Sequence, residues 1–191
     1  FAGLNAIASN MDNLIPTFGR NFLGFIGYGV MRELEFAIDY NKKLIHFYRI
    51  DDGGNTLEQP FYKKKPFLNF TLDKGSIMAY IYFAGKMLNF FLDTGAPKNS
   101  LDKTLLPQLD ENYISFTGLK DTVAGINSTM IITDDALMKQ FSIEDFVFDY
   151  MNTDIFYFPP GAGYNAILGY PFFKQKMFIF NYKTRQLSIA E

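Results

Sequence analysis

A carboxylate stands at the end of an apolar run in the stretch KMLNFFLDTGAPKNSLD, residues 86–102. Asp93 directly follows the apolar run and is itself followed by Thr94 and Gly95. Burying a charged carboxylate costs free energy unless the charge is paired, and perturbed carboxylates gather at functional sites. The glycine allows the backbone to approach the carboxylate and present N–H groups to it. Asp93 is therefore a candidate catalytic acid or base.

A plainer interpretation of the same triplet is a turn that ends a strand. Aspartate and glycine are both common in turns, for conformational reasons that have nothing to do with catalysis. The local sequence does not decide between the two interpretations, so the surrounding elements must.

Three strand-like runs lead up to Asp93. They cover residues 67–73, 76–83 and 86–93, and tight turns at 74–75 and 84–86 join them. Downstream, residues 133–150 have mixed spacing, which predicts a short strand or turn and then a strand at 145–150. The chain is thus expected to be mainly β.

An internal repeat gives the clearest organisational signal. The segment FIGYGVMRELEFAIDYNKKLIHF, residues 25–47, matches ILGYPFFKQKMFIFNYKTRQLSI, residues 167–189. Gly27 aligns with Gly169 at an offset of 142 residues, and Tyr40 aligns with Tyr182 at the same offset. One residue is then gained in the turn, so that Leu44 aligns with Leu187. Each copy is expected to form a glycine corner, a short segment and a two-stranded hairpin.

The repeat predicts one whole unit and part of another. Residues 66–191 form the complete unit, residues 51–65 form a linker rich in glycine, proline and charge, and residues 1–50 match only the trailing half of a unit. The front half of the first unit would lie before Phe1, where the chain shows neither an initiator methionine nor a leader-like segment. Residues 1–50 are therefore expected to expose strand edges and apolar faces that another chain or fragment covers.

These motifs together resemble those of a known enzyme family. The run FFLDTGA, followed downstream by AILGYPFF, is similar to the aspartic peptidases of the retropepsin and pepsin group, especially the two-copy bacterial relatives of retropepsin. The resemblance implies a mainly β, acid-protease fold, with one β-barrel lobe and the trailing half of a second, duplicated lobe. It implies that Asp93 is catalytic, and that the residues supporting its loop are Thr94, Gly95, Ala96, Ile167, Leu168 and Gly169. Pro97 departs from the family's pattern and fixes the chain just after the loop.

The chemistry that the resemblance implies requires two carboxylates. Two carboxylates held close together share one proton, so one acts as a base on water while the other donates a proton to the substrate carbonyl. No second Asp-Thr-Gly or Asp-Ser-Gly occurs in the chain. The partner of Asp93 must come from an upstream lobe or from Asp93 of a second molecule in a homodimer, and the repeat favours the upstream lobe. Asp39 is an unsuitable partner, since its counterpart is Asn181, at a strand end before a turn.

The implied substrate is an extended peptide or protein, bound under a hairpin flap. The flap candidate is residues 116–130, with Gly118 and Gly125 as bend points. Two alternatives stay open: a non-catalytic peptide-binding or interaction module that kept the cleft but lost the dyad, and a purely structural β domain.

Composition narrows the remaining possibilities. The 18 basic and 20 acidic residues show no basic stripe, which argues against nucleic acid as a partner. The absence of cysteine excludes thiolate chemistry, and the single histidine, His46, is expected to be an ordinary strand residue, so neither a metal site nor a cofactor is expected. The apolar runs are strand-sized, well short of the ~20 residues of a membrane-spanning helix, so no membrane insertion is expected. An extracytoplasmic location is expected from the family resemblance.

Overall fold

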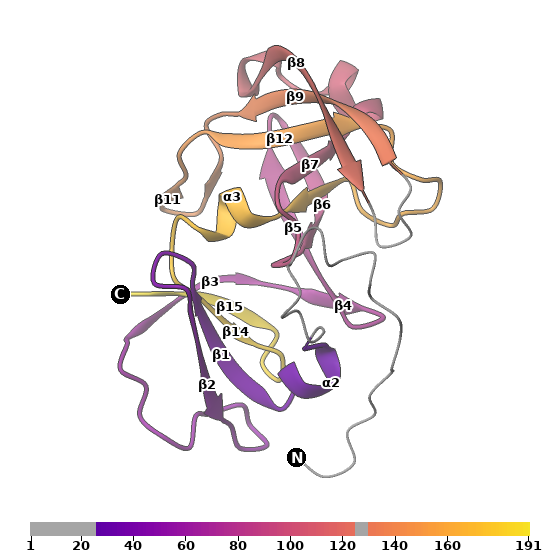
Figure 1. Ribbon diagram of the computed structural model, residues 1–191. Coiled ribbons are helices and arrows are strands. Elements are labelled where there is room, and N and C mark those ends of the chain that lie inside the picture. The colour runs from indigo at the N-terminus through magenta and orange to yellow at the C-terminus, as the bar shows by residue number, and fades with distance from the viewer. Residues whose placement is uncertain (1–25, 125–129) are drawn as a thin grey trace.

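The computed structural model describes residues 26–124 and 130–191 (Figure 1). Its described strands form an eight-stranded sheet, a five-stranded sheet and a small two-stranded ribbon. The expected mainly β class is confirmed. No helix in the described ranges is long and apolar enough to cross a membrane.

The eight-stranded sheet carries Asp93. Its strands run in the order β4-β5-β6-β13-β7-β12-β9-β8. Their bounds are β4 Thr71–Asp73, β5 Ser76–Phe83, β6 Lys86–Leu92, β7 Asn99–Asp102, β8 Ile114–Ala124, β9 Met130–Met138, β12 Met151–Phe156 and β13 Ala166–Leu168. The 3-10 helices η2 (Lys103–Gln108) and η3 (Glu111–Tyr113) connect β7 to β8, and the ribbon pairs β10 (Ser142–Ile143) with β11 (Phe146–Val147).

The five-stranded sheet joins distant parts of the chain, in the order β2-β1-β14-β15-β3 (Figure 1). Its strands are β1 Leu34–Asp39, β2 Leu44–Arg49, β3 Lys64–Asn69, β14 Phe178–Asn181 and β15 Gln186–Ala190. The β1–β2 hairpin therefore pairs directly with the β14–β15 hairpin. Short helices α2 (Tyr28–Met31) and α3 (Tyr170–Phe173) precede the two hairpins.

The strand predictions around Asp93 are largely confirmed, and those farther downstream are confirmed only in part. The expected strand 76–83 is β5, and the run 86–93 is β6 followed by Asp93. Residues 67–73 divide between β3 and β4, which belong to different sheets. Of the expected strand at 145–150, only the two-residue strand β11 forms. The neighbouring strands β9 and β12 mix charged and apolar residues, and they carry buried polar side chains such as Thr133 and Asp154.

Phenylalanine side chains form a large part of the core. Phe67 packs edge-on against Phe178, with ring centroids 5.8 Å apart, and Phe172 lies 4.8 Å from Phe178. These rings are almost completely buried. Aromatic pairs in this geometry add to the burial of apolar area, so they hold α3 against the five-stranded sheet.

The α2–β1–β2 and α3–β14–β15 segments are equivalent residue by residue. Both helices, their glycine N-caps and their C-caps fall at the same offset of 142 residues. Ala37 pairs across the sheet with Ile179, which is its own counterpart, so an approximate two-fold axis passes between them. Two tyrosine pairs are related by the same axis. The ring centroids of Tyr28 and Tyr182 lie 5.3 Å apart, and those of the counterpart pair, Tyr170 and Tyr40, lie 5.4 Å apart.

The one-residue insertion expected in the second turn is wrong. Asp39 pairs with Leu44 across the first turn, and Asn181 pairs with Gln186 across the second, so the offset of 142 continues through both turns. The single left-handed residue of each turn, Lys43 at φ 56° and Arg185 at φ 54°, follows the same offset. The extra leucine match suggested a shift that the backbone does not make.

Candidate active site

Asp93 lies at the point where β6 leaves the sheet, beside β13. Its backbone N–H donates to the Leu168 carbonyl over 2.9 Å, which continues the parallel pairing of Leu92 with Leu168. Ile167 and Leu168 thus lie beside the strand that leads to Asp93, as expected from the sequence. Leu92 and Leu168 are buried, so apolar side chains that exclude water support the strand end that carries the carboxylate.

The loop after Asp93 folds back onto its carboxylate. The Gly95 N–H donates to Asp93 Oδ1 over 2.9 Å, and the Ala96 N–H donates to the Asp93 carbonyl over 3.1 Å. The carboxylate is half-buried. A backbone donor fixed by a tight turn orients one oxygen and leaves the other available to a second group.

The Gly169 corner supports this loop from behind. The Gly169 N–H donates to Asn99 Oδ1 over 2.8 Å, and the Tyr170 N–H donates to the Ala96 carbonyl over the same distance. A Cβ at position 169 would lie 2.6 Å from the Ala96 carbonyl oxygen and closer still to that of Lys98, so only glycine fits without a backbone shift.

Tyr40 contacts the loop from the first hairpin. Its hydroxyl donates to the Thr94 carbonyl over 2.7 Å. Burial raises the pKa of Tyr40 to about 12, and the negative charge of Asp93 contributes to the shift, so the phenol stays a neutral donor at ordinary pH. Burial and the Asp93 charge also raise the pKa of Tyr164. Sequence reasoning used Tyr40 only as a repeat marker; its contact with a residue 54 positions away left no local signal.

We call Gly169, Tyr170 and Tyr40 the filled corner, because the Asp93 loop packs on them. Their counterparts Gly27, Tyr28 and Tyr182 form the open corner: a Cβ on Gly27 would meet no described atom within 4 Å.

A pocket of about 200 Å³ lies between the open corner and the Asp93 loop. Asp93 and Thr94 form one wall, and Tyr28 and Tyr182 form another. Burial raises the pKa of Tyr182 to about 12, so its hydroxyl also stays protonated. The other lining residues are Ile26, Gly27, Met31, Phe36, Gly75, Ser76, Ile77, Phe91, Leu92 and Phe180.

The flap candidate corresponds to the β8–β9 hairpin. Gly118 has φ 80° and lies in a β-bulge, where the pairing shifts between Phe116 and Lys120. Bulged strands bend at such positions. Gly125, the other expected bend point, lies outside the described residues. That the hairpin covers a substrate stays a prediction.

Three other ionisable side chains belong to a turn, an ion pair and a strand. Asp39 caps its turn by accepting the Lys42 N–H over 3.0 Å, as its counterpart Asn181 accepts that of Thr184 over 3.1 Å. The buried Glu35 pairs with Lys64 at 2.5 Å. His46 lies in β2.

One group of described carboxylates has the spacing of a metal site. Oxygens of Asp121, Asp135 and Asp154 lie within 4.8 Å of one another, but the Lys98 ammonium hydrogen-bonds all three.

Comparison with known proteins finds a likeness among solved structures and none at the level of sequence families. No family model and no curated protein matches the sequence. Among solved structures, the chain is similar to a retropepsin-like aspartic protease from Rickettsia conorii, with 14% identity and a TM-score of 0.43. The alignment covers 70% of this chain and 96% of that one.

Proposed function

We propose that this chain carries one half of the active site of an aspartic endopeptidase, with Asp93 as one of two catalytic carboxylates. The observation that carries the proposal is the Asp93 loop itself. A carboxylate at the end of a buried strand, oriented by the Gly95 N–H and lining a pocket, supports a role as one of the two carboxylates that share a proton.

In the proposed reaction the ionised carboxylate acts as a base and the protonated carboxylate acts as an acid. The ionised one takes a proton from water, whose oxygen attacks the peptide carbonyl carbon, while the protonated one donates to the carbonyl oxygen. Collapse of this tetrahedral intermediate moves a proton to the amide nitrogen and breaks the C–N bond. In this proposal Asp93 is positioned by the residues that follow it, Thr94, Gly95 and Ala96. The Asp93 loop is in turn supported by Ile167, Leu168 and Gly169.

The second aspartate would come from another lobe of the same kind. Tyr170 and Tyr40 both hydrogen-bond the Asp93 loop, at the Ala96 and Thr94 carbonyls. Their counterparts Tyr28 and Tyr182 line the pocket, on the side where the approximate two-fold axis would place an equivalent loop. A second Asp loop in the open corner would face Asp93 across this axis.

Burial in the two hairpins supports a second lobe at the first hairpin. Ile45 and Phe47 are 48% and 44% exposed, whereas their counterparts Leu187 and Ile189 are 0% and 3% exposed. β15 also pairs with β3 on its outer side, while the 44–48 part of β2 has no described strand there. Another lobe, on a longer polypeptide or a second molecule, would supply both the missing strand and the missing cover.

The proposed substrate is an extended peptide lying between the Asp93 loop and the β8–β9 hairpin. An extended peptide offers main-chain groups for hydrogen bonds. It also points alternate side chains toward the protein, where pockets can select among them. No cofactor or metal is required by this chemistry.

The test is cleavage of an unfolded protein from acid to neutral pH, by the wild type and by Asp93→Asn. Asparagine keeps the size of the side chain and one acceptor oxygen but cannot act as a base. We expect the variant to lose about 10²–10⁴-fold in rate. Equal cleavage by both would contradict the assignment of Asp93.

A peptide-binding module is the second candidate, and one observation favours it: the chain contains a single Asp-Thr-Gly triplet. In that case the folded wild type binds extended peptides and cleaves none at any pH. Binding without cleavage in every assembled form of the protein would establish the binding module.

A further inference from the structure

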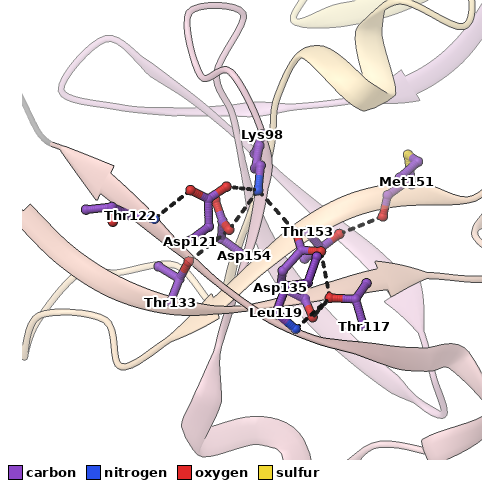
Figure 2. A network of polar contacts seen from close by, with 10 residues as sticks. All are labelled: Lys98, Thr117, Leu119, Asp121, Thr122, Thr133, Asp135, Met151, Thr153 and Asp154. Atoms are coloured by element: carbon purple, nitrogen blue, oxygen red, sulfur yellow. Dashed lines mark hydrogen bonds and ion pairs between the residues drawn. The ribbon is translucent and has the colours of Figure 1, made fainter.

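Lys98 lies five residues after Asp93 and bonds to three strands at once (Figure 2). Its ammonium contacts Asp154 Oδ1 on β12 and Asp135 Oδ1 on β9, each at 3.2 Å, and it also contacts Asp121 Oδ2 on β8. An ammonium has three N–H donors, so each has a carboxylate acceptor.

Among the described residues, Lys98 is the cation that all three carboxylates contact. Asp154 and Asp135 are directly opposite each other on β12 and β9, and the Asp154 side chain is only 2% exposed. Like charges directly opposite on neighbouring strands repel, and a buried charge without a partner is strongly destabilising. Lys98 offsets both effects.

Hydroxyl donors fix the carboxylates around the ammonium (Figure 2). Thr133 Oγ1 donates to Asp154 Oδ1 over 2.9 Å, and Thr117 Oγ1 donates to Asp135 Oδ2 over 2.8 Å. Although burial opposes it, hydrogen bonding to the three aspartates raises the pKa of Lys98, and the ammonium lowers the pKa of Asp121. These shifts favour the charged forms of Lys98 and Asp121.

The backbone of Lys98 belongs to the Asp93 loop. The loop is anchored on both sides of Lys98, because the Ala96 carbonyl accepts from Tyr170 and the Asn99 side chain accepts from Gly169. At the other end of the link, Asp121 lies beyond the bulge at Gly118, in the outer half of the hairpin. Lys98 thus joins the loop to that outer half.

We propose that Lys98 is a positioning residue that couples the Asp93 loop to the outer half of the β8–β9 hairpin. The role rests on the proposed function, since the hairpin's place relative to Asp93 matters if a peptide lies between them. No local pattern groups these residues, because 56 positions separate Lys98 from Asp154.

The test is hydrogen exchange of the 191-residue chain, which needs no enzymatic activity. In Lys98→Met we expect protection to fall about tenfold or more at 119–124, 130–135 and 93–97, and to stay unchanged in β5 and β6. Lys98→Arg keeps the charge and should retain most of the protection, although the planar fork fits three separate acceptors less well.

A neighbouring lysine supplies the matched control. Lys103 pairs with Asp134 of the same strand β9 at 2.6 Å but contacts none of the three aspartates. Lys103→Met should loosen the hairpin without loosening 93–97. Unchanged protection in Lys98→Met, or an equal effect of both variants on 93–97, would overturn the proposal.

A milder variant covers the case in which Lys98→Met does not fold. Asp121→Asn removes only the exposed acceptor at the hairpin end, so the buried carboxylates keep their cation. We expect looser exchange at 119–124 and 130–135; no change there would contradict the coupling. If cleavage is established, Lys98→Met should raise KM more than it lowers kcat, with Lys98→Arg in between, whereas absence of cleavage would leave the exchange result standing.

Discussion

The filled and open corners are equivalent in backbone and differ in what packs on them. Gly169 is buried under the Asp93 loop, whereas Gly27 meets no described atom within 4 Å of where a Cβ would be. The stacking of Arg32 on Tyr28 and of Lys174 on Tyr170 is repeated, with cation-to-ring distances of 5.9 and 5.4 Å. Because the scaffolds match, the difference between the corners comes from the loop, and the open corner shows what a second such loop would meet.

The largest difference is expected at the hairpin side chains that face the core. Leu187→Ala removes a fully buried side chain and should cost about 2–5 kcal/mol in the free energy of unfolding. Its counterpart Ile45 is half exposed in this chain, so Ile45→Ala should cost clearly less. Urea unfolding of both variants measures the gap, and equal costs would mean that Ile45 is already covered.

The corner glycines should differ by a smaller amount. Gly169→Ala drives a Cβ into the Ala96 and Lys98 carbonyls and should destabilise the chain by about 1–3 kcal/mol. A Cβ at Gly27 would meet no described atom within 4 Å, and φ there is −95°, so the free energy of unfolding of Gly27→Ala should stay within about 0.5 kcal/mol of wild type. A large cost at Gly27 would show that the corner is occupied.

The tyrosines give the smallest expected difference. Tyr40→Phe removes the hydrogen bond to Thr94 and should cost about 1 kcal/mol, whereas Tyr182→Phe should cost less in this chain. The folded pKa of Tyr40, about 12, is above its unfolded value near 10, so its contribution is present below pH 10 and is lost as pH rises toward 12. Unfolding followed from pH 8 to 12 should therefore show a shallower loss in Tyr40→Phe than in wild type.

Sequence reasoning located the features that are local along the chain. The apolar run before Asp93, the glycine corners and the two hairpins all have short-range signals, and the structure has each of them. Features that depend on distant partners were missed. The polar faces of β9 and β12 obscured the strand pattern at Asp135 and Asp154, because both carboxylates contact a lysine of the distant Asp93 loop. The contact of Tyr40 with Thr94 likewise exists only once the two hairpins share a sheet.

The most direct test of the second-lobe account uses the absence of cysteine in the chain. Gly27→Cys introduces the sole thiol, at an exposed position in the open corner, and Asp52→Cys places a control thiol on an exposed loop. The measurement is the rate of peptide cleavage before and after each thiol is alkylated with a bulky maleimide. The account predicts that modification at position 27 abolishes cleavage, because a second Asp loop must pack there, while modification at position 52 leaves the rate unchanged. Cleavage that continues at the full rate with position 27 modified would contradict it.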